Sequence, residues 1–192
     1  MTQPNPHKKS TISVKRMALD AVLIAMFFAL SLLQIPAGGL KFTFSALPII
    51  ICAVVFGPVD AFLVGLLGAL LEQMMTYGFT PTTILWILPA GVRGLFIGLC
   101  LLPLKKRHPI DTLLRDKRII VFYVICLCSA VIVSCFNTLT LYVDSKMYGY
   151  YTYALVFGSF VARIITGLIS SALMATATIP VVGALRRAKI VS

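Results

Sequence analysis

The sequence predicts an all-α integral membrane protein, a bundle of six transmembrane helices with both termini in the cytoplasm. Of its 192 residues, 59% are hydrophobic and 12% are charged, whereas about a quarter of the residues of a soluble domain are charged. Six apolar runs are separated by short polar or Pro/Gly segments, and a helix needs about 20 apolar residues to cross a bilayer. Most basic residues also fall on one side of this arrangement.

A polar tail, 1–14, is expected before a single membrane domain over 15–192. The first span, 17–35, is too long for a cleaved signal and ends at a Pro/Gly turn. The second, 42–56, contains Pro48 and measures roughly 22 Å at 1.5 Å per residue, so we expect it to be kinked or tilted.

Gly57-Pro58 breaks the chain before the third span, 59–75. The fourth span, 81–104, starts at a Thr-Pro pair and ends before a polar, basic stretch. The fifth, 119–142, precedes a tyrosine-rich loop at 144–151. The sixth, 153–185, is longer than one span, so its end is expected to project into water or to bend at Pro180.

The basic residues predict the orientation of the bundle. The formal net charge is +11, with 17 Lys and Arg against 6 Asp and Glu. With six spans, one side of the membrane receives thirteen of these cations: Lys8, Lys9, Lys15, Arg16, Lys105, Lys106, Arg107, Arg115, Lys117, Arg118, Arg186, Arg187 and Lys189. The opposite loops hold only Lys41 and Lys146. The positive charge therefore indicates cytoplasmic termini at a lipid bilayer, and not nucleic-acid binding.

The apolar runs lack the residues that catalysis, metal binding and ATP hydrolysis require. Both histidines, His7 and His108, fall in polar segments, so no imidazole is available inside the membrane for acid–base or metal chemistry. No pair of carboxylates and no Gly-rich phosphate loop is found, and the five cysteines lack metal-ligand spacing. We therefore expect no enzyme activity, no metal and no cofactor, and any transport would draw its energy from another protein.

Ionisable groups at membrane depth predict a binding site, because they are costly in hydrocarbon. Glu72, Arg93, Arg163 and the amide of Asn137 are all expected in the outer half of the bundle, where they could line an outward-opening cavity. Two cations against one anion favour a ligand with a carboxylate. As alternatives, Glu72 and Arg163 pair with each other to hold the bundle together, and Arg93 is structural.

Aromatic residues and a flexible loop complete the expected site. Tyr77 and Trp86 are placed at the cavity mouth, although an interfacial aromatic belt also explains such residues. The run from Gly38 to Thr43 combines flexibility, charge and an aromatic ring, which suits a lid. The expected substrate-binding residues are Lys41, Phe42, Thr43, Glu72, Tyr77, Trp86, Asn137 and Arg163.

Ala21, Ala25 and Ala29 form a ladder of small residues in the first span, which would let another helix approach closely. Packing inside the bundle is the alternative. With Phe56-Gly57-Pro58-Val59, Asn137-Thr138-Leu139 and the chain length, this ladder resembles the S components of energy-coupling factor (ECF) vitamin transporters, and most closely the folate type. Ala69 stands where that family tends to carry Asp.

The resemblance implies a six-helix subunit that captures a water-soluble vitamin from outside. It also implies docking, through the alanine ladder, onto a membrane coupling subunit that carries two cytoplasmic ATPases. Folate is the first choice of vitamin, and pantothenate and cobalamin are alternatives. The alternative function is a stand-alone secondary carrier or channel for a small anionic metabolite. A third class, a non-transporting scaffold or intramembrane enzyme, is not expected, because no catalytic constellation is found.

Overall fold

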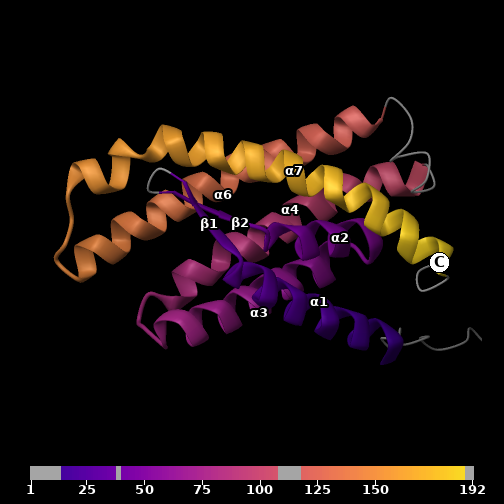
Figure 1. The fold of residues 1–192 in the computed structure, drawn as a ribbon, viewed down its shortest axis with the longest axis horizontal. Helices are drawn as coiled ribbons and strands as arrows, with labels where there is room; N and C mark the ends of the chain where they lie inside the picture. The colour runs from indigo at the N-terminus through magenta and orange to yellow at the C-terminus, as the bar shows by residue number, and fades with distance from the viewer. Residues whose placement is uncertain (1–13, 38–39, 108–117, 189–192) are drawn as a thin grey trace, which may run out of the picture.

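The computed structural model describes residues 14–37, 40–107 and 118–188 as an elongated helical bundle with one small hairpin (Figure 1). Its elements in chain order are α1 (Val14–Leu32), β1 (Gln34–Ala37), β2 (Leu40–Thr43), α2 (Ala46–Val55), α3 (Pro58–Tyr77), α4 (Thr83–Arg107), α6 (Ile119–Met147), the π-helical turn η1 (Ala154–Gly158) and α7 (Phe160–Arg187).

A two-stranded antiparallel sheet corrects the expectation of a purely helical chain. Strands β1 and β2 pair with Gln34 opposite Thr43 and Ala37 opposite Leu40. Two glycines join the strands in the sequence, and Pro36 ends the helical pattern after α1, which explains why the backbone turns back here. Strand β2 packs against α7 and α1, so the expected flexible lid contains regular structure. The turn itself, 38–39, lies outside the described residues.

Helix α2 is shorter than the span expected over 42–56. Thr43 belongs to β2, and the helix runs only from Ala46 to Val55, with Pro48 in its first turn, where a missing N–H costs nothing. Gly57 follows the helix with a φ of 116°, which favours glycine, and Pro58 opens α3. Eight of the ten α2 residues are buried, so this helix is the centre of the bundle.

Helices α3 and α4 approach to backbone contact along a row of glycines. A Cβ added at Gly65 would lie 2.4 Å from the carbonyl oxygen of Ala90, and one at Gly94 would lie 2.2 Å from that of Ala61. Small residues permit this distance, at which carbon and oxygen would otherwise overlap. The two helices therefore form one rigid pair.

Pro89 lies inside α4 and leaves the carbonyl of Leu85 without its usual helical donor. The hydroxyl of Thr140 on α6 donates to this oxygen at 3.1 Å. At membrane depth such a replacement is required, because water is not available to satisfy the carbonyl. Pro89 and Thr140 together fix α4 against α6.

The last two helices differ from the expected spans at their outer ends. Helix α6 continues to Met147 and takes in Asp144, which was expected in a loop. The sixth run is divided into the π-turn η1 and the long helix α7, and the interruption falls at Ser159 instead of at Pro180, through which α7 continues.

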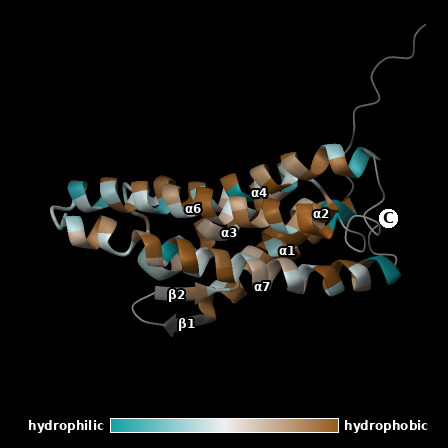
Figure 2. Ribbon diagram, turned by 90° about the horizontal axis from the view of Figure 1, so that it is seen from above, coloured by the Kyte–Doolittle hydropathy of each residue, from teal (hydrophilic) through white to brown (hydrophobic). Residues whose placement is uncertain are grey.

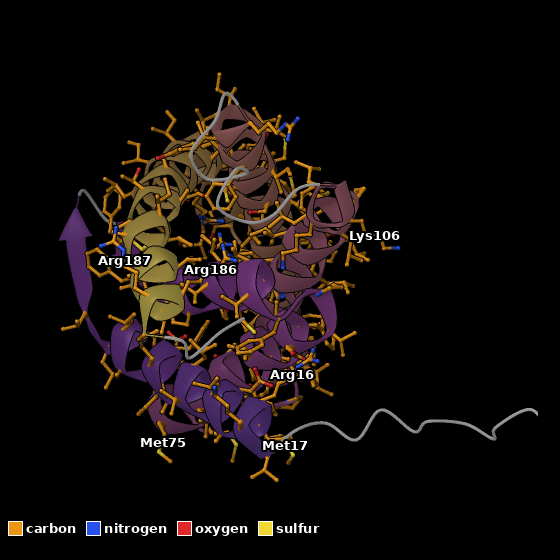
Figure 3. The ribbon with its side chains drawn as sticks, turned by 90° about the vertical axis from the view of Figure 1, so that its right-hand side faces the viewer. Arg16, Met17, Met75, Lys106, Arg186 and Arg187 are labelled. Carbon is orange, nitrogen blue, oxygen red and sulfur yellow. The ribbon has the colours of Figure 1, made fainter. Side chains whose placement is uncertain are left out.

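Cationic side chains gather at one end of the bundle, where α1 begins and α4 and α7 end. Figure 3 shows Arg16, Lys106, Arg186 and Arg187 at this end. Arg16 forms an ion pair with Asp60, and Lys105 donates to the carbonyl of Ala53 at 2.8 Å. These bonds tie the start of α1 to the start of α3, and the end of α4 to the end of α2. That this end is cytoplasmic stays a prediction.

The residues of the long helices are largely apolar, with hydrophilic residues concentrated toward the ends of the bundle (Figure 2). Among the described residues, four helical segments are long and apolar enough to cross a membrane: Pro58–Tyr77, Thr83–Lys106, Ile119–Met147 and Ala154–Arg187. For α1 and the short α2, spanning remains an expectation.

The glycine row between α3 and α4 makes a prediction about stability. Gly94→Ala places a methyl group against the carbonyl of Ala61, so the helices must separate, at an expected cost of about 1–3 kcal/mol. Gly183→Ala on α7 is the matched control, because no atom lies within 4 Å of its added Cβ. Thermal unfolding of the purified protein in detergent should show a lower midpoint for Gly94→Ala alone. Equal midpoints would refute the close contact.

Candidate ligand-binding cavity

A cavity of about 810 Å³ lies between the helices, within the range of small-molecule sites. Helix α3 contributes Ala69, Glu72, Gln73 and Tyr77 to its wall, and α4 contributes Trp86, Pro89, Ala90 and Arg93. The α6 side of the wall includes Val133, Ser134, Asn137, Leu141 and Asp144, and the α7 side Arg163, Thr166, Gly167 and Ser170. The turn after α6 is at the end of the bundle opposite the C-terminus (Figure 1).

Six of the eight expected binding residues lie in the wall of this one cavity: Thr43, Glu72, Tyr77, Trp86, Asn137 and Arg163. Phe42 is half-buried beside Thr43 and is not part of the wall. Lys41 lies in β2, but its side chain is outside the described part of the chain. The substrate contacts of all eight remain predictions.

Arg163 uses several of its N–H groups for hydrogen bonds within the protein. It donates to the carbonyl oxygens of Leu155 at 3.0 Å and Val156 at 3.4 Å, and to the hydroxyl of Thr138 at 3.5 Å. Both carbonyls belong to η1, where the helical pattern is interrupted. Arg163 therefore holds the π-turn against α6, and two of its five N–H groups remain for other partners.

Asp144 was missed as a site residue because its position was expected in a loop. It is buried near the C-terminal end of α6, where the hydroxyl of Thr82 donates to it at 2.6 Å and the indole of Trp86 at 3.4 Å. The hydroxyl of Tyr150 also donates to its carboxylate. This bond raises the pKa of Tyr150 to about 12, so the hydroxyl keeps its proton at neutral pH. Asp144 thus joins α4, α6 and the following turn.

The inclusion of Asp144 changes the charge of the site. The wall holds two acids, Glu72 and Asp144, and two arginines, Arg93 and Arg163, so the formal charges balance. The preference for an anionic ligand that was based on two cations against one anion is therefore removed. Among the described residues, no group of three His, Cys, Asp or Glu side chains could hold a metal ion.

The aromatic residues of the cavity wall and of the turn after α6 divide into two groups. Tyr77, Trp86, Tyr148 and Tyr150 line the cavity. Tyr142 instead packs edge-on against Tyr151, with ring centroids 5.5 Å apart, and the ammonium of Lys146 lies 4.1 Å from the ring centroid of Tyr151. The second group braces the turn after α6, and no sequence signal separated it from the first.

The bond from Tyr150 to Asp144 predicts the mobility of this turn. Tyr150→Phe removes one of the donors to Asp144, so backbone amides over 148–153 should exchange hydrogen several-fold faster. Tyr148→Phe is the matched control, because its hydroxyl makes no hydrogen bond to a described residue. Hydrogen exchange read by mass spectrometry checks the pair, and equal exchange in both variants would show that the bond does not hold the turn.

The fold is shared with solved S components at low sequence identity. "Crystal structure of FolT bound with folic acid" has a TM-score of 0.60 and 22% identity over 90% of this chain and 97% of that one. "Crystal structure at 2.1 A of the S-component for biotin from an ECF-type ABC transporter" has a TM-score of 0.59 and 15% identity over 92% and 95%. "Structure and mechanism of the S component of a bacterial ECF transporter" has a TM-score of 0.55 and 18% identity over 90% of this chain and 94% of that one.

Two curated relatives, each named "UPF0397 protein", match part of the sequence. The relative from Leuconostoc citreum (strain KM20) is 34% identical over 97 residues, 49% of this chain and 50% of its own. The relative from Streptococcus gordonii (strain Challis) is 30% identical over 96 residues, which are 47% of this chain and 48% of its own. The chain thus spans about half the length of the curated relatives it matches.

A family model matches almost the whole described chain. It is described as "ECF-type riboflavin transporter, S component" and covers residues 11–178. The resemblance to S components is thereby confirmed. The matching family is named for riboflavin, whereas the sequence was expected to resemble the folate type most closely. S components are membrane-embedded transporter subunits that work with an ECF module, and they are not a class of enzymes. The chain belongs to the family of ECF-type riboflavin transporter S components.

Proposed function

We propose that this chain captures a water-soluble vitamin with a planar ring system, riboflavin first, for uptake by an ECF-type ABC transporter. The observation that carries the proposal is the cavity of about 810 Å³, whose wall combines an apolar cluster with polar and charged side chains. Ligand sites of this kind are mostly apolar with a few placed polar groups. Residues of six helices, α1, α2, α3, α4, α6 and α7, and of β2 contribute to the described part of the wall.

The two ends of the cavity favour a ring at the inner end and a neutral polar tail at the outer end. Phe27, Ile49 and Ala69 form a buried apolar cluster that lines the inner part. Hydroxyl groups and the carboxylate of Asp144 line the outer part. Riboflavin has a flat ring system and an uncharged ribityl chain. The family whose model matches this chain is also named for riboflavin.

Folate is the second candidate. Its support is the folate-bound neighbour with the same fold and the two arginines of the wall. Against it, the glutamate tail of folate would meet the carboxylate of Asp144 near the mouth, where like charges repel. Pantothenate has no ring for the apolar end, and cobalamin is much larger than the ligands that such a cavity encloses.

The partners we propose are a membrane coupling subunit and two cytoplasmic ATPases. Helix α1 packs on α2 and α3 and buries Leu23, Phe27 and Ser31. The opposite face carries Ala21, Ala25 and Ala29, all three exposed, and this face could receive a helix of the coupling subunit. A stand-alone carrier or channel for a small anionic metabolite is the competing function, with Glu72 and Arg163 as its relay.

A vitamin panel tests the ligand. The purified chain alone should bind riboflavin saturably with 1:1 stoichiometry, raise its unfolding midpoint on binding, and return the vitamin unchanged. Thermal shift and native mass spectrometry against riboflavin, folate, pantothenate, biotin and cobalamin measure this. Tighter binding of folate would move the assignment to the second candidate. Ion-driven uptake by the chain alone in liposomes would favour the carrier.

Ala25→Trp tests the docking face. A bulky ring on the exposed face of α1 blocks close helix approach, so assembly with the coupling subunit, and therefore uptake, should be lost while ligand affinity changes less than about twofold. Ala162→Trp, an equally large change at an exposed position of α7, is the matched control and should keep assembly. Co-purification and ligand binding are measured on both variants. A joint loss of binding and stability in Ala25→Trp would instead indicate packing inside the bundle.

A further inference from the structure

One face of α4 runs along the cavity from its mouth to its inner part. Trp86, Pro89, Ala90 and Arg93 line the wall at spacings of three, four and seven residues, which place them on a single side of the helix. At 1.5 Å per residue, Arg93 lies about 10 Å deeper along the helix than Trp86. Arg93 is thus the deep cation of the site.

The backbone that carries Arg93 is held in place by its neighbours. Gly94 is in contact with the backbone of α3 at Ala61, and Ala90 with Gly65, so α4 cannot shift away from α3 without losing this packing. The bond from Thr140 to Leu85 fixes the same helix against α6 at the residue next to Trp86. The depth of Arg93 is therefore set by the scaffold and not by its own side-chain bonds.

Arg93 differs from Arg163 in how its donors are used. Its Nε is buried and has no hydrogen-bond partner among the described residues, whereas Arg163 donates to two carbonyls and a hydroxyl. A buried donor of a charged group without an acceptor is costly, so its presence at membrane depth indicates a functional site. Arg93 also shares its wall with Ser134 and Asn137 from the facing helix.

The surroundings of Arg93 indicate which part of a ligand would reach it. The apolar cluster of Phe27, Ile49 and Ala69 lines the same cavity, with Ala90 packed against it. On α3, Ala69 lies about 12 Å deeper than Tyr77, counted at 1.5 Å per residue. An apolar slot that holds one fixed guanidinium suits a flat heterocycle whose edge carries hydrogen-bond acceptors.

Resting on the proposed function, we propose that Arg93 determines specificity by donating two N–H groups to the acceptor edge of the vitamin's ring system, a carbonyl oxygen beside an unprotonated ring nitrogen. Flavins and pterins both carry this edge. The ring enters first, and the tail lies toward Tyr148 and Tyr150. Arg163 acts mainly on the protein, where it holds η1.

The test separates the ring from the tail. Riboflavin is compared with lumichrome, an alloxazine that keeps the three fused rings and the C4 carbonyl beside the unprotonated N5 but lacks the ribityl chain, by quenching of their fluorescence on the purified full chain. Arg93→Met should weaken the binding of both probes by the same factor, about 10- to 100-fold, because the bonds to the ring are lost in each case. Arg187→Met, at the opposite end of the bundle, is the control and should bind both probes like the wild type.

Three outcomes overturn the assignment. Unchanged affinity for both probes in Arg93→Met shows that Arg93 does not contact the ligand. Loss of riboflavin affinity with lumichrome binding retained shows that Arg93 contacts the tail. If Arg93→Met does not fold, Arg93→Lys decides, since lysine keeps the charge and loses the planar fork: it should bind lumichrome at least about fivefold more weakly, and equal affinity rejects the proposal.

The result also distinguishes this inference from the proposed function. If the wild type binds folate instead of riboflavin, 6-hydroxymethylpterin replaces lumichrome as the ring-only probe and the same criteria apply. Wild-type binding with an unaffected Arg93→Met rejects the role of Arg93 alone. A wild type that binds neither vitamin rejects the proposed ligand class, and the role of Arg93 with it.

Discussion

A polar group at membrane depth has to find its hydrogen bonds inside the protein, because hydrocarbon offers none. This constraint explains most of the polar contacts in the bundle. Thr140 supplies the donor that Pro89 takes away from Leu85, and Arg163 occupies the carbonyls of the π-turn. Asp144 accepts from three side chains. Each arrangement satisfies a group that would otherwise be unstable there, and each joins elements that are distant in the sequence.

The apolar runs and their breakers predicted the helices well, because the bilayer fixes the length and hydropathy of any spanning segment. Gly57-Pro58 ends α2 and begins α3 as expected. The hairpin was not predicted, since two strands of four residues each leave too little periodicity to identify. The position of the break at Ser159 depends on Arg163 and η1, which no local pattern encodes.

The site was predicted in part for a similar reason. Glu72, Asn137 and Arg163 stand out as polar residues in apolar runs, and the structure brings them to one cavity with Trp86 and Tyr77. Asp144 lies three residues before the end of α6, where a loop and a helix end have the same composition. Its role depends on Thr82, 62 residues earlier, and such a long-range partner is visible only after folding. The balance of charge in the cavity follows from this one residue.

Helix α2 has ten residues and is therefore about 15 Å long, half of a hydrocarbon core of roughly 30 Å. Ala46 and Ile49, at its beginning, face the cavity, while Ile50, Cys52 and Val54 have no exposed surface. The first turn of α2 therefore borders the cavity, and the rest of the helix is packed in the core. A bound solute would lie against the beginning of α2 and could not pass along the buried part of this helix. Passage beyond that depth would require α2, or the whole subunit, to move relative to the lipid.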